Sequence, residues 1–150
     1  MGTLQEFHIL QIEDASGSRT VRLTAATYSI GRDSVSNSIV VPDPAVSRTH
    51  AMFLRMPLPG NRYQYRVIDG DVTGKKSTNG VFVNGQPCNE RKLRTGDTIM
   101  LGERARLSYL IAQMTQDEYD QFFNADSPQF HSLKEESLDP TGTLMTILAN

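Results

Sequence analysis

The feature of this sequence that most restricts its fold is a series of short apolar or β-branched runs, each closed by turn residues. Several of the runs alternate between apolar and polar positions, as strands with one buried face do. No helical pattern of about 10–15 residues separates them, so parallel β-α-β units are not expected. Runs spaced at roughly 8–12 residues indicate an all-β sandwich or barrel. They span residues 7–12, 20–24, 28–30, 38–41, 51–54, 63–68, 81–83, 98–101 and 105–111.

The character of the sequence changes after about residue 113. Thr115 fits the N-cap of a short helix, Glu118 stands at its capping-box position, and three aromatic residues share one face. We expect this face to pack on the sandwich, and we expect the polar residues beyond it to form a flexible tail. At 150 residues, the chain has the length of about one domain. The predicted organisation is a sandwich over 1–113, a helix over 114–125 and a tail over 126–150.

Composition excludes several functions. With 15 Lys and Arg residues against 17 Asp and Glu residues, the net charge of −2 does not provide the basic field that nucleic-acid binding requires. The single cysteine, Cys88, excludes an internal disulfide framework, and the three histidines are not spaced as metal ligands. We expect no cofactor and no metal. Without a signal peptide or a long apolar run, we expect a cytoplasmic protein that does not bind membranes.

Three polar islands interrupt the apolar runs. They are Gly31-Arg32, Ser47-Arg48-Thr49-His50 and Ser77-Thr78-Asn79-Gly80. Together they offer two guanidinium groups, several hydroxyls and a side-chain amide, which suit a phosphate dianion and the peptide backbone beside it. No nucleophile is paired with a base, so an enzyme is not expected.

Each island taken alone has a simpler explanation. A Gly-Arg pair is usually a turn with a solvated charge, and Ser47 fits a turn hydroxyl. His50 fits a structural role better than a catalytic one. Asn84-Gly85 is interpreted as a hairpin turn and nothing more. The functional interpretation therefore depends on the islands occurring together.

The islands, in this order and spacing, resemble the forkhead-associated (FHA) domain. The resemblance covers about residues 5–113 and includes the later segment from Leu93 through Gly96-Asp97 to Leu101-Gly102. It implies a β-sandwich of about eleven strands whose loops at one end bind phosphothreonine peptides. It also implies a partner that carries phosphothreonine and a non-catalytic adaptor role in Ser/Thr kinase signalling.

The resemblance assigns roles to individual residues. Arg32 and Ser47 would contact the phosphate, with Arg48 as an additional contact. Thr78 would lie beside the phosphate and help to form a pocket for the threonine methyl group. Asn79 would hydrogen-bond to the main chain of the peptide.

Other residues would support the site, and one loop departs from the family pattern. Gly31, His50 and Gly80 match structural positions, with His50 bracing the Ser47 loop. The segment 69–76 ahead of Ser77 is longer than usual in the family and adds Lys75 and Lys76. We expect this segment to influence selectivity.

Two alternatives remain open at this point. The sandwich could be a scaffold that docks an unphosphorylated partner through a sheet face. Alternatively, Thr141 or Thr143 in the tail could be phosphorylated, so that the domain captures its own tail and inhibits itself.

Overall fold

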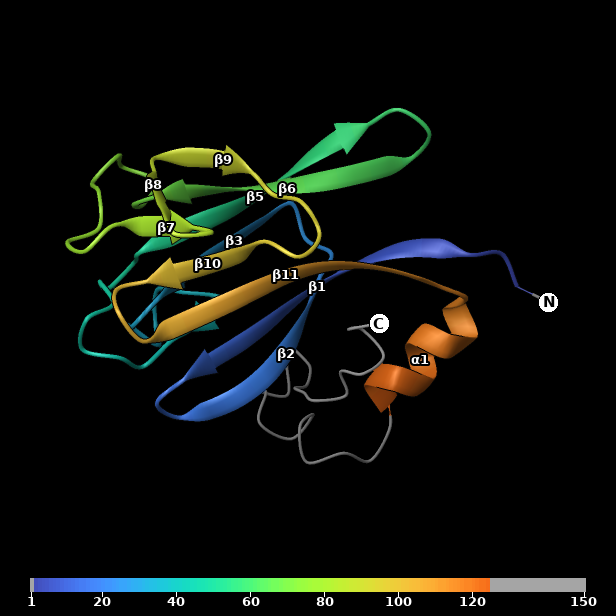
Figure 1. Ribbon diagram of the computed structural model, residues 1–150, viewed down its shortest axis with the longest axis horizontal. Helices are drawn as coiled ribbons and strands as arrows, with labels where there is room; N and C mark the ends of the chain where they lie inside the picture. Colours follow the sequence, from blue (N-terminus) through green and yellow to red (C-terminus); the bar gives the residue numbers. More distant parts are fainter. Residues whose placement is uncertain (1, 125–150) are drawn as a thin grey trace.

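A computed structural model describes residues 2–124, which form eleven strands and one helix in two packed sheets (Figure 1). The first sheet has six strands in the order β2-β1-β11-β10-β7-β8, and the second has five in the order β4-β3-β5-β6-β9. All strand pairs are antiparallel except β3 with β4. The elements are β1 Gln5–Asp14, β2 Gly17–Leu23, β3 Thr27–Gly31, β4 Ile39–Val40, β5 Ala51–Leu58, β6 Arg62–Asp69, β7 Val81–Val83, β8 Gln86–Cys88, β9 Glu90–Lys92, β10 Thr98–Leu101, β11 Ala105–Met114 and α1 Gln116–Asn124.

The core lies between the two sheets. Alternate positions point inward, so that Leu10 and Leu107 of one sheet and Phe53 and Val67 of the other are fully buried in one cluster. The predicted all-β sandwich of about eleven strands with a short C-terminal helix is confirmed.

Two strands carry none of the apolar alternation on which the sequence analysis relied. β8 and β9 are edge strands of three residues each, and neither has a fully buried residue. The extended conformation of β8 and β9 comes from pairing with β7 and β6, and not from the pattern of their own residues. Pro57 lies inside β5, three residues beyond the apolar run 51–54 that predicted this strand. It is tolerated there because β3 pairs only with residues 51–54 of β5, so Pro57 lies beyond that ladder.

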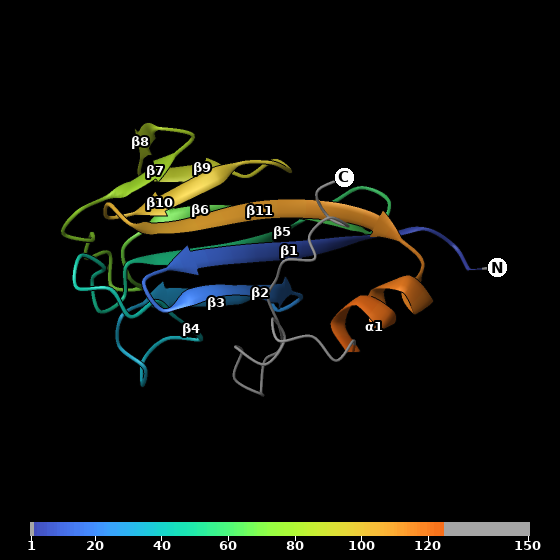
Figure 2. The ribbon, with the colours of Figure 1, turned by 60° about the horizontal axis from the view of Figure 1, so that its bottom comes forward.

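The helix α1 packs on the outer face of the six-stranded sheet at one end, against β1 and β11 (Figure 2). Thr115 Oγ1 accepts a hydrogen bond from the Glu118 N–H at 3.1 Å, and Glu118 Oε1 accepts one from the Thr115 N–H at 2.8 Å. This reciprocal pair is a capping box. Tyr119 and Phe123 pack against Ile9 and the neighbouring apolar side chains of the sheet.

Replacing Thr115 by alanine is expected to lower the free energy of unfolding by about 1 kcal/mol, because the Glu118 N–H loses its acceptor. Urea denaturation monitored by circular dichroism measures this change. Thr115→Ser keeps the hydroxyl and should unfold like the wild type. Equal stability of the alanine variant would contradict a stabilising cap.

In the described residues, no helix is long and apolar enough to cross a membrane. The predicted domain boundaries at residues 113 and 125 stay predictions. The tail and its candidate phosphoacceptors, Thr141 and Thr143, lie outside the described residues.

Candidate functional site

The three polar islands meet at one end of the sandwich. They occupy the loops after β3, before β5 and before β7, which lie together at the left of Figure 1. Backbone hydrogen bonds join the first two loops, from the Arg32 N–H to the Ser47 carbonyl at 3.0 Å and from the His50 N–H to the Ile30 carbonyl at 2.7 Å. By contrast, the Asn84-Gly85 turn follows β7 and lies at the opposite end, with φ of 52° and 83° as in a hairpin turn.

Gly31 permits a close backbone approach. Its φ does not lie in the left-handed region, so the backbone conformation itself does not require glycine here. Instead, a Cβ at this position would lie 2.0 Å from the Arg48 carbonyl oxygen. Glycine is therefore required because the first and second islands pass each other at backbone contact distance.

The guanidinium of Arg32 is anchored at one nitrogen only. Its Nε donates to the Val46 carbonyl at 2.9 Å, and the residue is exposed. Within residues 2–124, its two terminal nitrogens have no hydrogen-bond or ion-pair partner. The guanidinium is therefore held in one orientation and still has N–H donors with which it can bind an anion.

Arg48 is also exposed, and its backbone rather than its side chain is fixed. Its carbonyl accepts from the Asp33 N–H at 3.3 Å and from Asn37 Nδ2 at 2.5 Å. The Asp33 carboxylate accepts from the backbone N–H and the hydroxyl of Ser36, and these bonds hold its pKa below the usual value. The Arg48 guanidinium therefore extends from a well-held backbone.

Ser47 joins the second and third islands. Its Oγ accepts a hydrogen bond from the Thr78 N–H at 2.9 Å, which leaves the hydroxyl proton of Ser47 able to donate. Thr78 itself is exposed beside this bond. The structure therefore brings Ser47 and Thr78 together.

The buried side chain of His50 holds the Ser47 loop in place through both ring nitrogens. Its Nδ1 accepts from the Ser47 N–H at 3.0 Å, and its Nε2 lies 2.7 Å from the Gly80 carbonyl, so Nε2 carries the proton. The ring is fully buried, and burial lowers the pKa of His50 below its usual value. The neutral imidazole therefore links the second and third islands without facing solvent.

Asn79 holds the third island against the second. Its Nδ2 donates to the Ala45 carbonyl at 2.8 Å, although the residue is exposed. The adjacent Gly80 has φ of 83° and its N–H donates to Ser77 Oγ at 2.9 Å. One Asn79 N–H and the side-chain carbonyl are left to engage a ligand.

The long segment before Ser77 folds on itself. Asp71 Oδ1 accepts from the backbone N–H groups of Thr73 and Lys75, at 2.9 and 3.0 Å, and from the Thr73 hydroxyl at 2.6 Å. These bonds hold the pKa of Asp71 below its usual value. Lys75 and Lys76 are exposed on this compact loop.

Asp43 is a residue of this site that the sequence analysis did not single out. It is 1% exposed, and it accepts from the Ala45 N–H through Oδ1 and from the Val46 N–H through its carbonyl, both at 2.9 Å. The carbonyls of Ala45 and Val46 are the acceptors for Asn79 and Arg32. Asp43 therefore shapes the turn that orients both side chains. Its only sequence signal is its position between two prolines.

Asp43→Ala is expected to cost about 1 kcal/mol of stability, because the Ala45 N–H loses its acceptor. It should also weaken, several-fold, the phosphopeptide binding that the family resemblance predicts, as the carbonyls that hold Arg32 and Asn79 shift. Asp43→Asn keeps an acceptor oxygen and is the matched control. Denaturation and peptide titration test both effects. If the alanine variant is destabilised but binds the peptide as the wild type does, Asp43 contributes to stability and not to binding.

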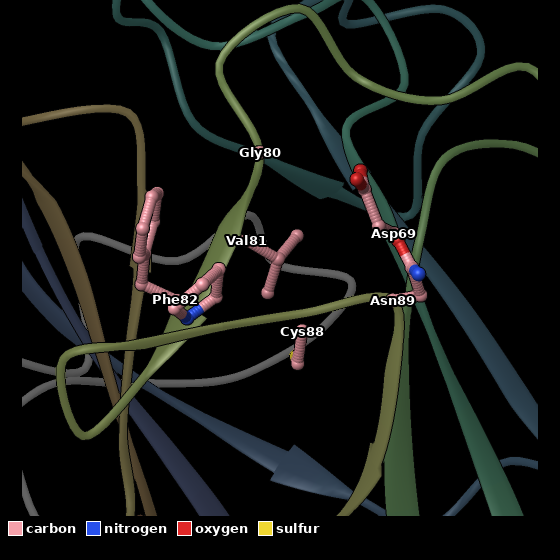
Figure 3. Close-up of a pocket in the computed structure, with 7 residues that line it drawn as sticks. Asp69, Gly80, Val81, Phe82, Cys88 and Asn89 are labelled. Atoms are coloured by element: carbon pink, nitrogen blue, oxygen red, sulfur yellow. The ribbon is translucent and has the colours of Figure 1, made fainter.

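A pocket of about 280 Å³ lies beside Gly80, between the β7–β8 hairpin and the end of β6 (Figure 3). Phe82 and Cys88 contribute apolar walls, and Asp69 and Asn89 contribute polar atoms. Asp69 Oδ1 accepts from the Ser77 N–H at 3.1 Å, so this carboxylate also supports the third island. Burial raises the pKa of the Cys88 thiol, which therefore stays neutral at pH 7.

In residues 2–124, no group of three or more His, Cys, Asp or Glu side chains is arranged to hold a metal ion.

Comparison with known proteins identifies relatives of this chain. The sequence pattern of the FHA domain matches residues 28–102. The uncharacterized protein sll1895 of Synechocystis is 39% identical over 100 residues, which are 67% of this chain and 14% of that protein. The oxoglutarate dehydrogenase inhibitor of Corynebacterium jeikeium is 39% identical over 95 residues, which are 63% of this chain and 57% of the inhibitor. This chain therefore spans less than two thirds of either relative.

Solved structures agree with this relationship. The Slr1951 protein of Synechocystis has a TM-score of 0.66 and 39% identity, over 69% of this chain and 96% of that one. An FHA domain studied for its phosphothreonine-dependent interactions has a TM-score of 0.57 and 30% identity, over 72% and 99%. The FhaA FHA domain, in complex with the intracellular domain of Rv3910, has a TM-score of 0.54 and 32% identity, over 68% and 98%. The chain therefore belongs to the FHA domain family, whose members are interaction modules known for phosphothreonine-dependent binding.

Proposed function

We propose that this chain binds phosphothreonine peptides and acts as a non-catalytic, cytoplasmic adaptor in Ser/Thr kinase signalling. The observation that carries the proposal is the anchoring of Arg32 through Nε alone, beside the free hydroxyl proton of Ser47. Both groups belong to one loop end that His50 and Asn79 tie together.

The chemistry of the site fits a phosphate dianion. A phosphothreonine carries about −1.5 to −2 charges and three strong acceptor oxygens. The terminal nitrogens of Arg32 would donate two parallel hydrogen bonds, Ser47 a third, and Arg48 a second positive charge. Thr78 would lie against the threonine methyl group.

Asn79 would recognise the main chain of the peptide. Its side-chain amide still has one N–H and one carbonyl oxygen to offer, a donor and an acceptor in one plane. Lys75 and Lys76 would influence selectivity through attraction to acidic residues of the partner.

The relatives support a role in protein binding. One is named as an inhibitor of oxoglutarate dehydrogenase, and one similar structure is an FHA domain in complex with an intracellular domain. The partner of this chain would be a protein that carries phosphothreonine.

The test is calorimetric titration with the best peptide from an oriented phosphothreonine library, its dephosphorylated form and its phosphoserine analogue. We expect the dephosphorylated form not to bind. The phosphoserine analogue should bind about fourfold more weakly, because one buried methyl group is worth about 0.8 kcal/mol. Equal binding of the dephosphorylated peptide would refute the proposal and favour a phosphate-independent scaffold.

A further inference from the structure

Strand β5 is apolar on both faces. Its inward residues Ala51 and Phe53 belong to the core, but the alternate residues Met52, Leu54 and Met56 point to the opposite side. A strand of this composition is typical of sheets that are covered on both faces, whereas the solvent face of an antiparallel sheet is usually polar. The outer face of the five-stranded sheet is therefore unusual.

The register extends this apolar surface to the neighbouring strand. Met52 pairs with Ile68 of β6, and Leu54 pairs with Arg66. These four side chains and that of Met56 are each partly exposed, and none belongs to either buried cluster. We call Met52, Leu54, Met56 and Ile68 the β5 patch.

No helix of the described residues covers this patch. The one described helix, α1, packs on the opposite sheet and lies well away from β5, β6 and β9 in Figures 1 and 2. The two sheets therefore differ in how their outer apolar residues are covered. Those of the six-stranded sheet pack under the aromatic side chains of α1, whereas the β5 patch has no helix over it among residues 2–124.

The charges beside the β5 patch indicate what covers it. On β9, Glu90 pairs in register with Ile68, and Lys92 pairs with Arg66. Glu90 makes an ion pair with Arg66, whereas Lys92 has no ion-pair partner in residues 2–124. Lys92 thus faces a like charge across the strands, an arrangement that is unfavourable until a carboxylate approaches.

We propose that the β5 patch is the interface of a homodimer of this chain. The two-fold axis would lie in the interface and run perpendicular to the strands, midway between Met52 and Leu54. Rotation about this axis places Glu90 of each copy opposite Lys92 of the other. The same rotation places Met52 against Leu54 of the second copy, with the sheets about 10 Å apart. Both the apolar patch and the charged pair are then self-complementary, as a two-fold interface requires.

The interface lies on a sheet face, whereas the phosphate site lies in the end loops. The inference therefore goes beyond the proposed function, and each can fail without the other. The dimer would give two phosphothreonine sites on one particle, so partners with two marks would bind with avidity.

Light scattering and sedimentation of the full chain over a concentration series test the proposal. We expect the mass to rise from 16.7 kDa toward twice that value. Leu54→Lys should abolish the dimer, and Lys92→Glu should weaken it about tenfold or more, because it sets carboxylates opposite each other. The double variant Glu90→Lys with Lys92→Glu reverses both charges and should recover most of the affinity.

Arg104→Glu, an equal charge change in the β10–β11 turn, is the matched control and should dimerise like the wild type. Phosphopeptide affinity of Lys92→Glu should be unchanged, which separates dimer loss from damage to the site. A wild type that stays at 16.7 kDa at all concentrations would overturn the proposal. So would a dimer that Leu54→Lys and Lys92→Glu leave intact.

Discussion

Arg32→Ala is expected to weaken binding of a phosphothreonine peptide by about tenfold to a hundredfold, the loss that follows removal of a charge-assisted contact worth about 1.5–3 kcal/mol. The fold should survive, because the side chain is exposed and makes one hydrogen bond, to the Val46 carbonyl. Calorimetric titration measures the affinity, and thermal unfolding checks the fold.

Two further variants separate the geometry of Arg32 from its charge. Arg32→Lys keeps the charge but loses the planar fork, so it should bind between the wild type and Arg32→Ala. Arg94→Ala removes an exposed arginine from the β9–β10 turn at the other end of the sandwich and should bind like the wild type. An Arg32→Ala variant that titrates like the wild type would refute the phosphate role.

Most of the fold could be predicted because its central strands carry their own signal. β6 and most of β11 alternate between buried and less buried positions, so their hydrophobic pattern is visible in the residues. β1 and β2 alternate only in part, because His8, Ile9 and Leu10 are buried in succession, as are Thr20 and Val21. β8 and β9 could not be predicted this way, since their conformation comes from pairing at the sheet edges. The expected number of about eleven strands came from the family resemblance.

The candidate site was predictable where side chains carry the chemistry. Arg32, Ser47 and Asn79 are recognisable because a guanidinium, a hydroxyl and an amide suit phosphate and peptide. Asp43 was missed, because its role is to shape a turn whose backbone carbonyls hold other side chains. Such backbone geometry leaves little trace in the residue types, and the ligand contacts themselves stay predictions.

His8 gives the protein a built-in sensitivity to acid. The side chain is 1% exposed and stacks on Tyr63, with ring centroids 4.1 Å apart. Tyr109 Oη accepts from the Tyr65 N–H at 3.3 Å and shares a hydrogen bond of 2.5 Å with His8 Nδ1. His8 Nε2 is buried and has no hydrogen-bond partner among the described residues, so no acceptor there would stabilise the doubly protonated ring. Burial lowers the pKa of His8 from 6.5 to about 4, an effect that nearby Glu6 opposes and Arg62 reinforces.

The free energy of unfolding should therefore fall as the pH drops from about 6.5 to about 4. Between these values the unfolded chain takes up a proton at His8 and the folded chain does not, so acid favours unfolding. The full shift corresponds to about 3 kcal/mol at 1.36 kcal/mol per pKa unit. His50, whose pKa burial also lowers, should add in the same direction, whereas the depressed carboxylate pKa values of Asp14 and Asp71 act mainly below this window.

Urea denaturation at a series of pH values from 7 to 4 measures this dependence for the wild type and for His8→Gln. Glutamine keeps a hydrogen-bond donor and an acceptor but does not titrate, so the variant should lose less stability on acidification. The difference between the two pH slopes isolates His8 even where the substitution itself lowers stability. Parallel slopes would mean that His8 binds its proton equally well in the folded and unfolded chain, which its burial against Tyr63 and Tyr109 argues against.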